Sequence, residues 1–133
     1  IYKSMVAGDG KPHNATGALD TLMAGLACGE PSTISWGVLR DYAAASISCP
    51  DYIAANGMRI LSSPVDADPR VISGESGAVT CGILDFITRN PEGAAIHQAL
   101  KLDASSQVLL MSTEGDTSPE TYRDVVWYGK YTG

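Results

Sequence analysis

One segment of the chain constrains the fold more than any other. Val71 and Ile72, two β-branched residues that favour a strand, lead directly into a turn with glycines at positions 74 and 77. Apolar residues then recur at helical spacing from position 79 to position 87. A strand, a tight glycine turn and a helix in this order are typical of folds in which helices cover a mainly parallel sheet. We therefore expect an α/β fold with such a sheet.

Similar units are predicted along the rest of the chain. Residues 47–49 and 107–111 form β-prone or apolar runs of strand length. Residues 1–15 hold glycine, proline and asparagine without a clear period, so we expect mostly loop there. No repeat or low-complexity tract divides the chain, and we expect residues 1–133 to form a single compact unit. Helices are predicted over residues 18–27, 32–42, 50–61, 75–87, 91–100 and 118–126.

The composition argues against several classes of protein. Fifteen Asp and Glu against nine Lys and Arg give a net charge of -6, and no basic stripe suits a nucleic-acid partner. Every apolar run ends well before the roughly 18 residues that a membrane span requires. Three cysteines, Cys28, Cys49 and Cys81, match neither a disulfide framework nor a zinc pattern, so we expect thiols, no metal site and a cytoplasmic protein. The chain begins with Ile1 and not with Met, and we expect it to be part of a longer protein.

Two polar loops lie where a parallel sheet places its ligands, at the carboxyl ends of strands. Ser112 and Thr113 follow directly on the predicted strand 107–111, so their hydroxyls either reach a ligand or cap the loop. The turn 73–77 offers backbone amides at a helix start and the Glu75 carboxylate. In the simpler interpretation Ser76 is only the N-cap of that helix, and the glycines only make the turn.

A serine hydrolase is an alternative interpretation of the same turn. Its sequence Gly-Glu-Ser-Gly-Ala is one residue short of the nucleophile elbow G-x-S-x-G, because Ala78 stands in place of the last glycine. Asp85 and His97 would complete the order serine, acid, histidine after Ser76. Both would lie on helices close after the nucleophile, where a side chain reaches Ser76 only with difficulty.

Three blocks of sequence, in order, carry a family resemblance. The blocks are MAGLACGEP at residues 23–31, DPRVISGESGA at residues 68–78 and STEGDT at residues 112–117. They resemble the diaminopropionate ammonia-lyase family, a lyase family within the fold-type II pyridoxal phosphate enzymes, to which threonine dehydratase and the tryptophan synthase β chain also belong. The similarity runs over nearly the whole chain.

The resemblance implies that residues 1–133 are the C-terminal segment of the large domain of an enzyme about three times longer. It implies the cofactor pyridoxal 5'-phosphate, a homodimer in the intact enzyme, and conversion of 2,3-diaminopropionate to pyruvate and ammonia by α,β-elimination. The Schiff-base lysine, the glycine run for the cofactor phosphate and the base lie outside this chain, so the segment alone should be inactive. A serine or threonine dehydratase on the same scaffold is the alternative, and a catalytically silent folding unit is the non-enzyme alternative.

The resemblance also assigns cofactor-binding residues. Ser112 matches the serine that hydrogen-bonds the pyridine nitrogen of the cofactor, and Thr113 is its neighbour. Gly74 and Glu75 match the family turn beside the cofactor ring. A neutral hydroxyl, unlike a carboxylate, does not need a protonated ring nitrogen, which makes the ring a weaker electron sink and suits elimination. Catalytic residues in the strict sense stay unknown from this chain.

Overall fold

The computed structural model describes all 133 residues and divides them into two compact units. Unit 1 holds Ile1–Thr21 and Gly25–Cys49, and unit 2 holds Leu22–Ala24 and Pro50–Gly133. The sequence predicted a single unit. Residues 45–50, which lead from unit 1 to unit 2, adopt no regular secondary structure.

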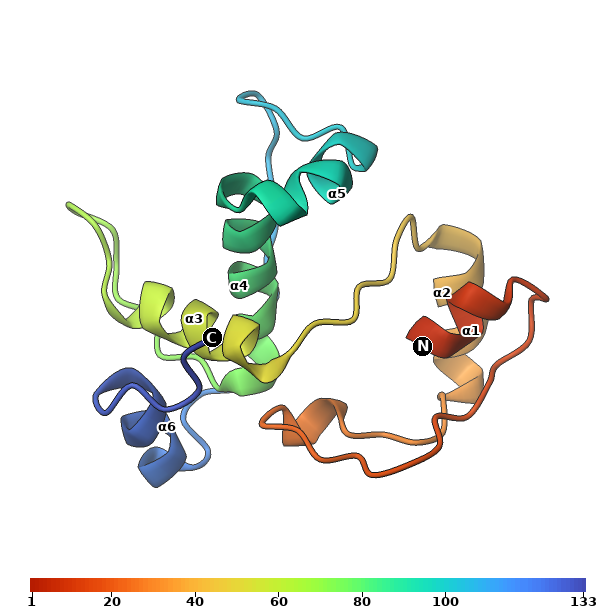
Figure 1. Ribbon diagram of the computed structural model, residues 1–133, viewed down its shortest axis with the longest axis horizontal. Coiled ribbons are helices and arrows are strands. Elements are labelled where there is room, and N and C mark those ends of the chain that lie inside the picture. Colours follow the sequence, from red (N-terminus) through yellow and green to blue (C-terminus); the bar gives the residue numbers. More distant parts are fainter. The chain divides into compact units, whose positions relative to one another are not determined.

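Unit 1 consists of two helices and the loops between them (Figure 1). Helix α1 spans Tyr2–Ala7 and ends at Gly8 in the left-handed conformation, with φ of 66°. Helix α2 spans Thr33–Tyr42, and Ser32 caps it by accepting a hydrogen bond from the Ser35 amide at 3.3 Å. The opening residues were predicted to be mostly loop. A helix of six residues is too short to show a period, which is why the sequence did not reveal it.

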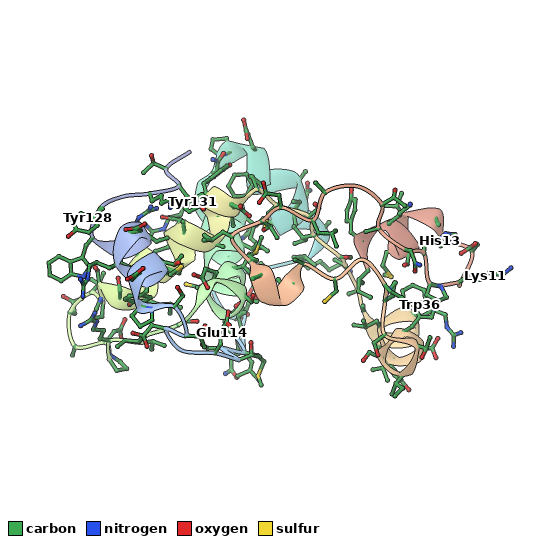
Figure 2. All side chains as sticks on the ribbon, turned by 90° about the horizontal axis from the view of Figure 1, so that it is seen from below. Lys11, His13, Trp36, Glu114, Tyr128 and Tyr131 are labelled. Carbon is green, nitrogen blue, oxygen red and sulfur yellow. The ribbon has the colours of Figure 1, made fainter.

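A loop of unit 1 is held by two buried side chains. Ser4 is 1% exposed, and its hydroxyl accepts a hydrogen bond from the His13 amide at 2.8 Å. Trp36 is also buried, and its indole N–H donates to the Gly10 carbonyl at 3.0 Å (Figure 2). The His13 ring lies 3.0 Å from both carboxylate oxygens of Asp9. The Lys11 amide and then His13 lower the pKa of Asp9 below its ordinary value.

The helix predicted over residues 18–27 is not formed. Only a 3-10 turn, η1, spans Ala24–Leu26. A glycine inside a helix costs about 1 kcal/mol relative to alanine, and Gly25 sits inside this stretch. Most of its side chains are exposed or half-buried, so little burial offsets that cost.

Unit 2 is built around two helices that pack backbone against backbone. Helix α3 spans Asp51–Ser62 and helix α4 spans Glu75–Arg89, and they cross in Figure 1. A Cβ at Gly82 would collide with the Ile53 carbonyl oxygen, and one at Gly57 would collide with the Ala78 carbonyl oxygen and lie 2.7 Å from the Gly82 nitrogen. The helices therefore approach this closely only because both positions lack a side chain.

Helix α6 completes the core of this unit. It spans Pro119–Val126, follows Ser118 as predicted, and packs on α3. Tyr122 and Val125 are buried against Met58, Ala55 and Ala78. The Arg59 guanidinium donates to the Val125 carbonyl at 3.1 Å, which fixes the end of α6.

A short pair of helices follows α4. The 3-10 helix η2 spans Pro91–Gly93 and helix α5 spans Ala94–Ala99, which matches the predicted helix from Pro91. Asn90 caps η2, since its side-chain oxygen accepts from the Glu92 amide at 2.9 Å. Across the whole structure, none of the helices combines the length and the apolar character that a membrane span needs.

The predicted parallel sheet is not present in the structure, in which no residue belongs to a β-strand. The runs 47–49, 71–72 and 107–111 have no regular secondary structure, and Leu109 and Met111 are 84% and 65% exposed. A strand exists only where a neighbouring strand takes its backbone hydrogen bonds, and these runs do not pair with one another. The apolar character that predicted strands is real, but this chain alone does not bury it.

The contact between α3 and α4 gives a direct test. We expect Gly57→Ala or Gly82→Ala in the full-length protein to lower the free energy of unfolding by about 2 kcal/mol or more, because the new methyl meets backbone that cannot turn away. Denaturant unfolding measures this change. Gly37→Ala in α2 is the matched control: its Cβ enters open space, so stability should stay equal or rise by about 0.5–1 kcal/mol. Equal stability of all three variants would contradict the close packing.

Candidate functional site

The two polar loops predicted from the sequence meet in unit 2. The Ser112 hydroxyl donates a hydrogen bond to the Ser73 hydroxyl at 2.8 Å, although the two residues are 39 positions apart. Ser73 is 1% exposed, whereas Ser112 is exposed. The turn at 73–77 and the loop at 112–117 therefore lie in contact with one another.

Gly77 leaves room for this serine pair. A Cβ at Gly77 would lie 2.7 Å from the Ser73 hydroxyl oxygen and 3.1 Å from that of Ser112. Both distances are shorter than a carbon and an oxygen tolerate without a shift. The second glycine of the turn is thus required by a close approach of side chains, and not by its own backbone conformation.

Glu114 ties the second loop to the start of α4. Its carboxylate oxygen accepts a hydrogen bond from the Ser76 amide at 2.8 Å, and its backbone carbonyl accepts from the Gly74 amide at 3.1 Å. Both amides belong to the first turn of a helix, where N–H groups lack partners within the helix and the helix dipole favours a negative charge. Glu114, labelled in Figure 2, therefore clamps the loop to the helix.

The sequence did not single out Glu114. The simpler interpretation of the sequence made Ser76 the N-cap, but α4 begins at Glu75 with Gly74 as its N-cap, and the Ser76 hydroxyl is buried without a hydrogen-bond partner. The capping is done by a residue 38 positions further on. An acidic residue directly after the two hydroxyls was the signal available, and it gains meaning only when the two loops are known to meet.

The remaining predicted site residues surround the pair to different degrees. Gly74 is buried, and a Cβ there would lie 2.6 Å from the Gly115 carbonyl oxygen and 2.7 Å from Glu114 Cγ. Glu75 is half-buried in the first turn of α4, and Thr113 is exposed beside Ser112. The second loop and the serine pair thus cover Gly74 and Gly77, and the exposed residues Ser112 and Thr113 are the part of this junction that a ligand can reach.

The arrangement that a serine hydrolase needs is absent. The Ser76 hydroxyl has no hydrogen-bond partner, so neither histidine nor carboxylate activates it. Asp85 lies nine residues further along the same helix, about 13 Å away at 1.5 Å per residue. Its carboxylate is already bound by Asn56 at 3.0 Å and Arg89 at 3.1 Å.

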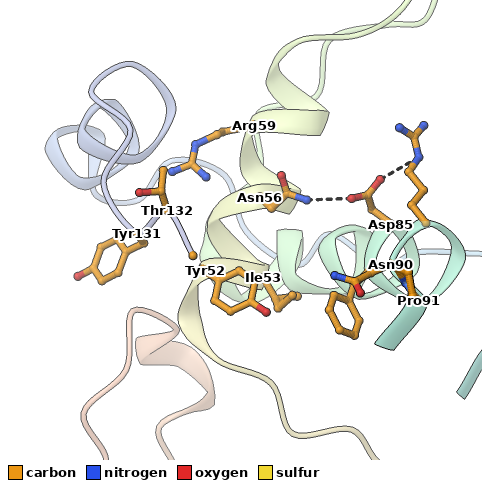
Figure 3. A pocket seen from close by; sticks show the side chains of 12 residues that line it. Tyr52, Ile53, Asn56, Arg59, Asp85, Asn90, Pro91, Tyr131 and Thr132 are labelled. Carbon is orange, nitrogen blue, oxygen red and sulfur yellow. Dashed lines mark hydrogen bonds and ion pairs between the residues drawn. The ribbon is translucent and has the colours of Figure 1, made fainter. Parts of the chain in front are cut away.

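A separate polar hollow lies between α3, α4 and the C-terminal residues (Figure 3). Its volume is about 510 Å³, and Tyr52, Asn56, Arg59 and Asp85 are among its lining residues. Neither serine of the pair lines it. On the same helix as Asp85, burial and then the Asp85 charge raise the pKa of the Cys81 thiol above its ordinary value.

The structure shows neither a disulfide nor a metal centre. Cys28, Cys49 and Cys81 form no disulfide. No group of three or more His, Cys, Asp or Glu side chains lies close enough together to hold a metal ion. The candidate site is thus the Ser73–Ser112 pair with the hydrogen bonds of Glu114 beside it.

The comparisons with known proteins agree with the three blocks of sequence. No protein-family model matches the chain. Diaminopropionate ammonia-lyase from Salmonella typhimurium is 50% identical over 98% of this chain, and the enzyme of that name from Escherichia coli K12 is 49% identical over the same share. The chain spans about a third of these relatives, 32% of their length, and matches their C-terminal part.

Solved structures give the same result. The crystal structure of diaminopropionate ammonia lyase from Escherichia coli in complex with an aminoacrylate-PLP azomethine reaction intermediate has a TM-score of 0.84 and 47% identity over 98% of this chain. The complex of the same enzyme with D-serine has a TM-score of 0.85 and 46% identity. The chain covers 32% of each of these structures. This chain is thus similar in sequence and structure to about a third of the length of each of these enzymes.

The Glu114 clamp predicts a graded loss of stability. Glu114→Ala removes the acceptor of the Ser76 amide, so we expect the free energy of unfolding of the full-length protein to fall by about 1–2 kcal/mol. Glu114→Gln keeps an acceptor oxygen without the charge and should lose less than half as much. Asp116→Ala, in the same loop and exposed, is the matched control and should change little. A loss equal to that of Asp116→Ala would contradict the clamp.

Proposed function

We propose that this chain is the C-terminal part of a pyridoxal phosphate-dependent diaminopropionate ammonia-lyase, and that the Ser73–Ser112 junction is one wall of its cofactor site. The observation that carries this proposal is the 2.8 Å hydrogen bond between the hydroxyls of exposed Ser112 and buried Ser73, at the turn that leads into α4. The 50% identity to the Salmonella typhimurium enzyme over 98% of the chain supports it.

The residues at this junction fit a flat heterocyclic cofactor. Gly74 and Gly77 let the second loop and the serine pair approach the start of α4, and the exposed Ser112 hydroxyl can form a hydrogen bond to a ring nitrogen. In the proposed site Ser112 holds the pyridine nitrogen, Thr113 lies beside it, and Gly74 and Glu75 line the ring. Bound pyridoxal phosphate supplies an electron sink for the carbanion formed at the α carbon of the substrate.

The proposed reaction consumes 2,3-diaminopropionate and water and yields pyruvate and two molecules of ammonia. The Cα–H bond and the Cβ–N bond break, the β-amino group departs as the first ammonia, and hydrolysis of the remaining enamine releases the second. Ser112 contributes a neutral hydroxyl that orients the ring without placing a negative charge beside the ring nitrogen, as a carboxylate would. The Schiff-base lysine, the phosphate-binding glycines and the base that removes the α proton belong to the rest of the enzyme in this proposal.

The predicted sheet also belongs to this proposal. Residues 47–49, 71–72 and 107–111 would become strands by pairing with strands of the remaining two thirds of the enzyme, with all 133 residues inside one large domain. The exposed Leu109 and Met111 support this, since an unpaired apolar run is a template for strand pairing. A homodimer, a cytoplasmic location and the lack of a nucleic-acid partner are further parts of the proposal, supported by the family resemblance and the acidic composition.

One observation favours a second candidate activity. The Escherichia coli relative has been crystallised with D-serine, a hydroxy amino acid. A serine or threonine dehydratase would use the same junction and the same cofactor, with water as the leaving group in place of ammonia. The two activities differ only in which amino acid yields a keto acid.

The substrate assay decides between them. Full-length enzyme loaded with pyridoxal phosphate should form pyruvate from 2,3-diaminopropionate with a kcat/KM at least about tenfold above that for serine, a difference of about 1.4 kcal/mol in transition-state stabilisation. Coupled reduction of pyruvate measures both rates, and enzyme without cofactor is the control. Pyruvate from serine alone would favour the dehydratase. No keto acid from either amino acid, with cofactor bound, would contradict the proposal.

The role of Ser112 predicts a separation of binding from turnover. Ser112→Ala in the full-length enzyme should retain cofactor, because one hydrogen bond contributes little to its affinity, but should lower kcat about tenfold, the equivalent of about 1–1.5 kcal/mol. Absorbance of bound cofactor and the rate of pyruvate formation measure the two effects. Ser118→Ala is the control, because Ser118 is the N-cap residue of α6 and its side chain makes no capping hydrogen bond. Unchanged turnover in Ser112→Ala would refute the assigned role.

A further inference from the structure

We propose that Ser73 is a positioning residue, whose buried hydroxyl sets the direction in which the Ser112 hydroxyl donates its proton. This inference rests on the proposed function, because the acceptor of that proton is the ring nitrogen of pyridoxal phosphate. It adds to the proposed site a residue that does not touch the cofactor. Its basis is the hydrogen-bond chain of the two serines and the space that Gly77 keeps for them.

The hydrogen-bond chain has a defined direction in the structure. The Ser112 hydroxyl donates to the Ser73 oxygen at 2.8 Å, and the Ser73 hydroxyl donates to the Gly74 carbonyl at 3.2 Å. A carbonyl only accepts, so the Ser73 proton goes to Gly74 and the Ser73 oxygen is left as an acceptor. The Ser112 hydroxyl also lies 3.4 Å from the Glu114 carbonyl, a longer and weaker contact than the one to Ser73. Without a ligand the Ser112 proton thus points inward, toward Ser73.

A ring nitrogen with a free lone pair reverses this order. Each hydroxyl has one proton and can rotate it without moving its oxygen. When Ser112 turns its proton outward to the nitrogen, Ser73 can turn its own proton to the Ser112 oxygen. The 2.8 Å contact between the oxygens is kept. The bonds that are lost are the longer ones, from Ser73 to the Gly74 carbonyl at 3.2 Å and from Ser112 to the Glu114 carbonyl at 3.4 Å.

The lost bonds leave no polar group unsatisfied. The Glu114 carbonyl still accepts a hydrogen bond from the Gly74 amide at 3.1 Å. The Gly74 carbonyl also accepts a hydrogen bond from the Ala78 amide at 2.9 Å, in the first turn of α4. The reversed chain has a further advantage, because a hydroxyl that accepts a hydrogen bond becomes a stronger donor. Ser73 therefore strengthens the bond from Ser112 to the ring nitrogen in the reversed arrangement.

The surroundings indicate that this pair is built into the fold. Ser73 is 1% exposed, so water does not replace its hydroxyl as a partner of Ser112. A Cβ at position 77 would approach both hydroxyl oxygens, at 2.7 Å and 3.1 Å. The simpler alternative is that the Ser73–Ser112 bond merely ties the loop to the helix. That alternative predicts a loss of stability without any change at the cofactor.

The test is a double-mutant cycle in the full-length enzyme loaded with pyridoxal phosphate labelled with ¹⁵N in the ring. Ser73→Ala should retain cofactor, lower kcat about fivefold, as expected for the loss of one hydrogen bond, and shift the ring ¹⁵N resonance in the same direction as Ser112→Ala does. The double variant should match Ser112→Ala within about twofold in kcat, because coupled residues are not additive. Ser62→Ala is the matched control, a buried serine of α3 that donates to the Arg59 carbonyl.

The outcomes separate this inference from the proposed function. Additive losses in the double variant, or a ¹⁵N resonance in Ser73→Ala that does not move, would overturn the positioning role while the lyase stands. A wild-type enzyme that neither binds the cofactor nor forms pyruvate would overturn both. If Ser73→Ala does not fold, Ser73→Cys keeps a weak donor of similar size and should give a smaller ¹⁵N shift in the same direction.

Discussion

The close approach of α3 and α4 determines where everything else in unit 2 lies. Gly57 and Gly82 allow the two backbones to lie close together, and the residues packed around them are small or fully buried. Helix α6 then closes the core through Tyr122 and Val125. Because α4 is held along its length, its first turn is a fixed surface with unpaired N–H groups. That surface receives the second polar loop.

The loop binds this surface through charge and through shape. The Glu114 carboxylate satisfies an amide of the first turn of α4, and Gly74 and Gly77 allow the loop to approach where side chains would collide. The consequence is a buried hydroxyl, Ser73, in direct contact with an exposed one, Ser112. A pair of this kind is suited to orient one hydrogen bond toward a ligand, and pyridoxal phosphate is the ligand that the relatives of this chain suggest.

The sequence predicted the meeting of the two loops but not what holds them together. Glycines, hydroxyls and a predicted helix start are local features, so the turn at 73–77 and the start of α6 after Ser118 could be found. Glu114 was missed because its role depends on an amide 38 residues away. Ser76 was misassigned for the same reason: the cap that a neighbour usually supplies comes here from a distant loop.

The predicted sheet is not formed in residues 1–133 for a different physical reason. Val71, Ile72 and the run 107–111 have the apolar character of buried strands, but a strand needs a partner for its backbone groups, and pairing is not a property of one segment. The exposed Leu109 and Met111 show how much apolar surface is left without that partner. A local pattern can thus indicate a strand where the chain alone does not form one.

A crystal structure of the full-length protein grown with pyridoxal phosphate tests the central claim most directly. The measurement is the distance from the Ser112 hydroxyl oxygen to the pyridine nitrogen of the cofactor. We expect a hydrogen bond of about 2.6–3.2 Å, with Ser73 still in contact with Ser112 on its inner side. A cofactor bound elsewhere, or one whose ring nitrogen faces a different residue, would contradict it.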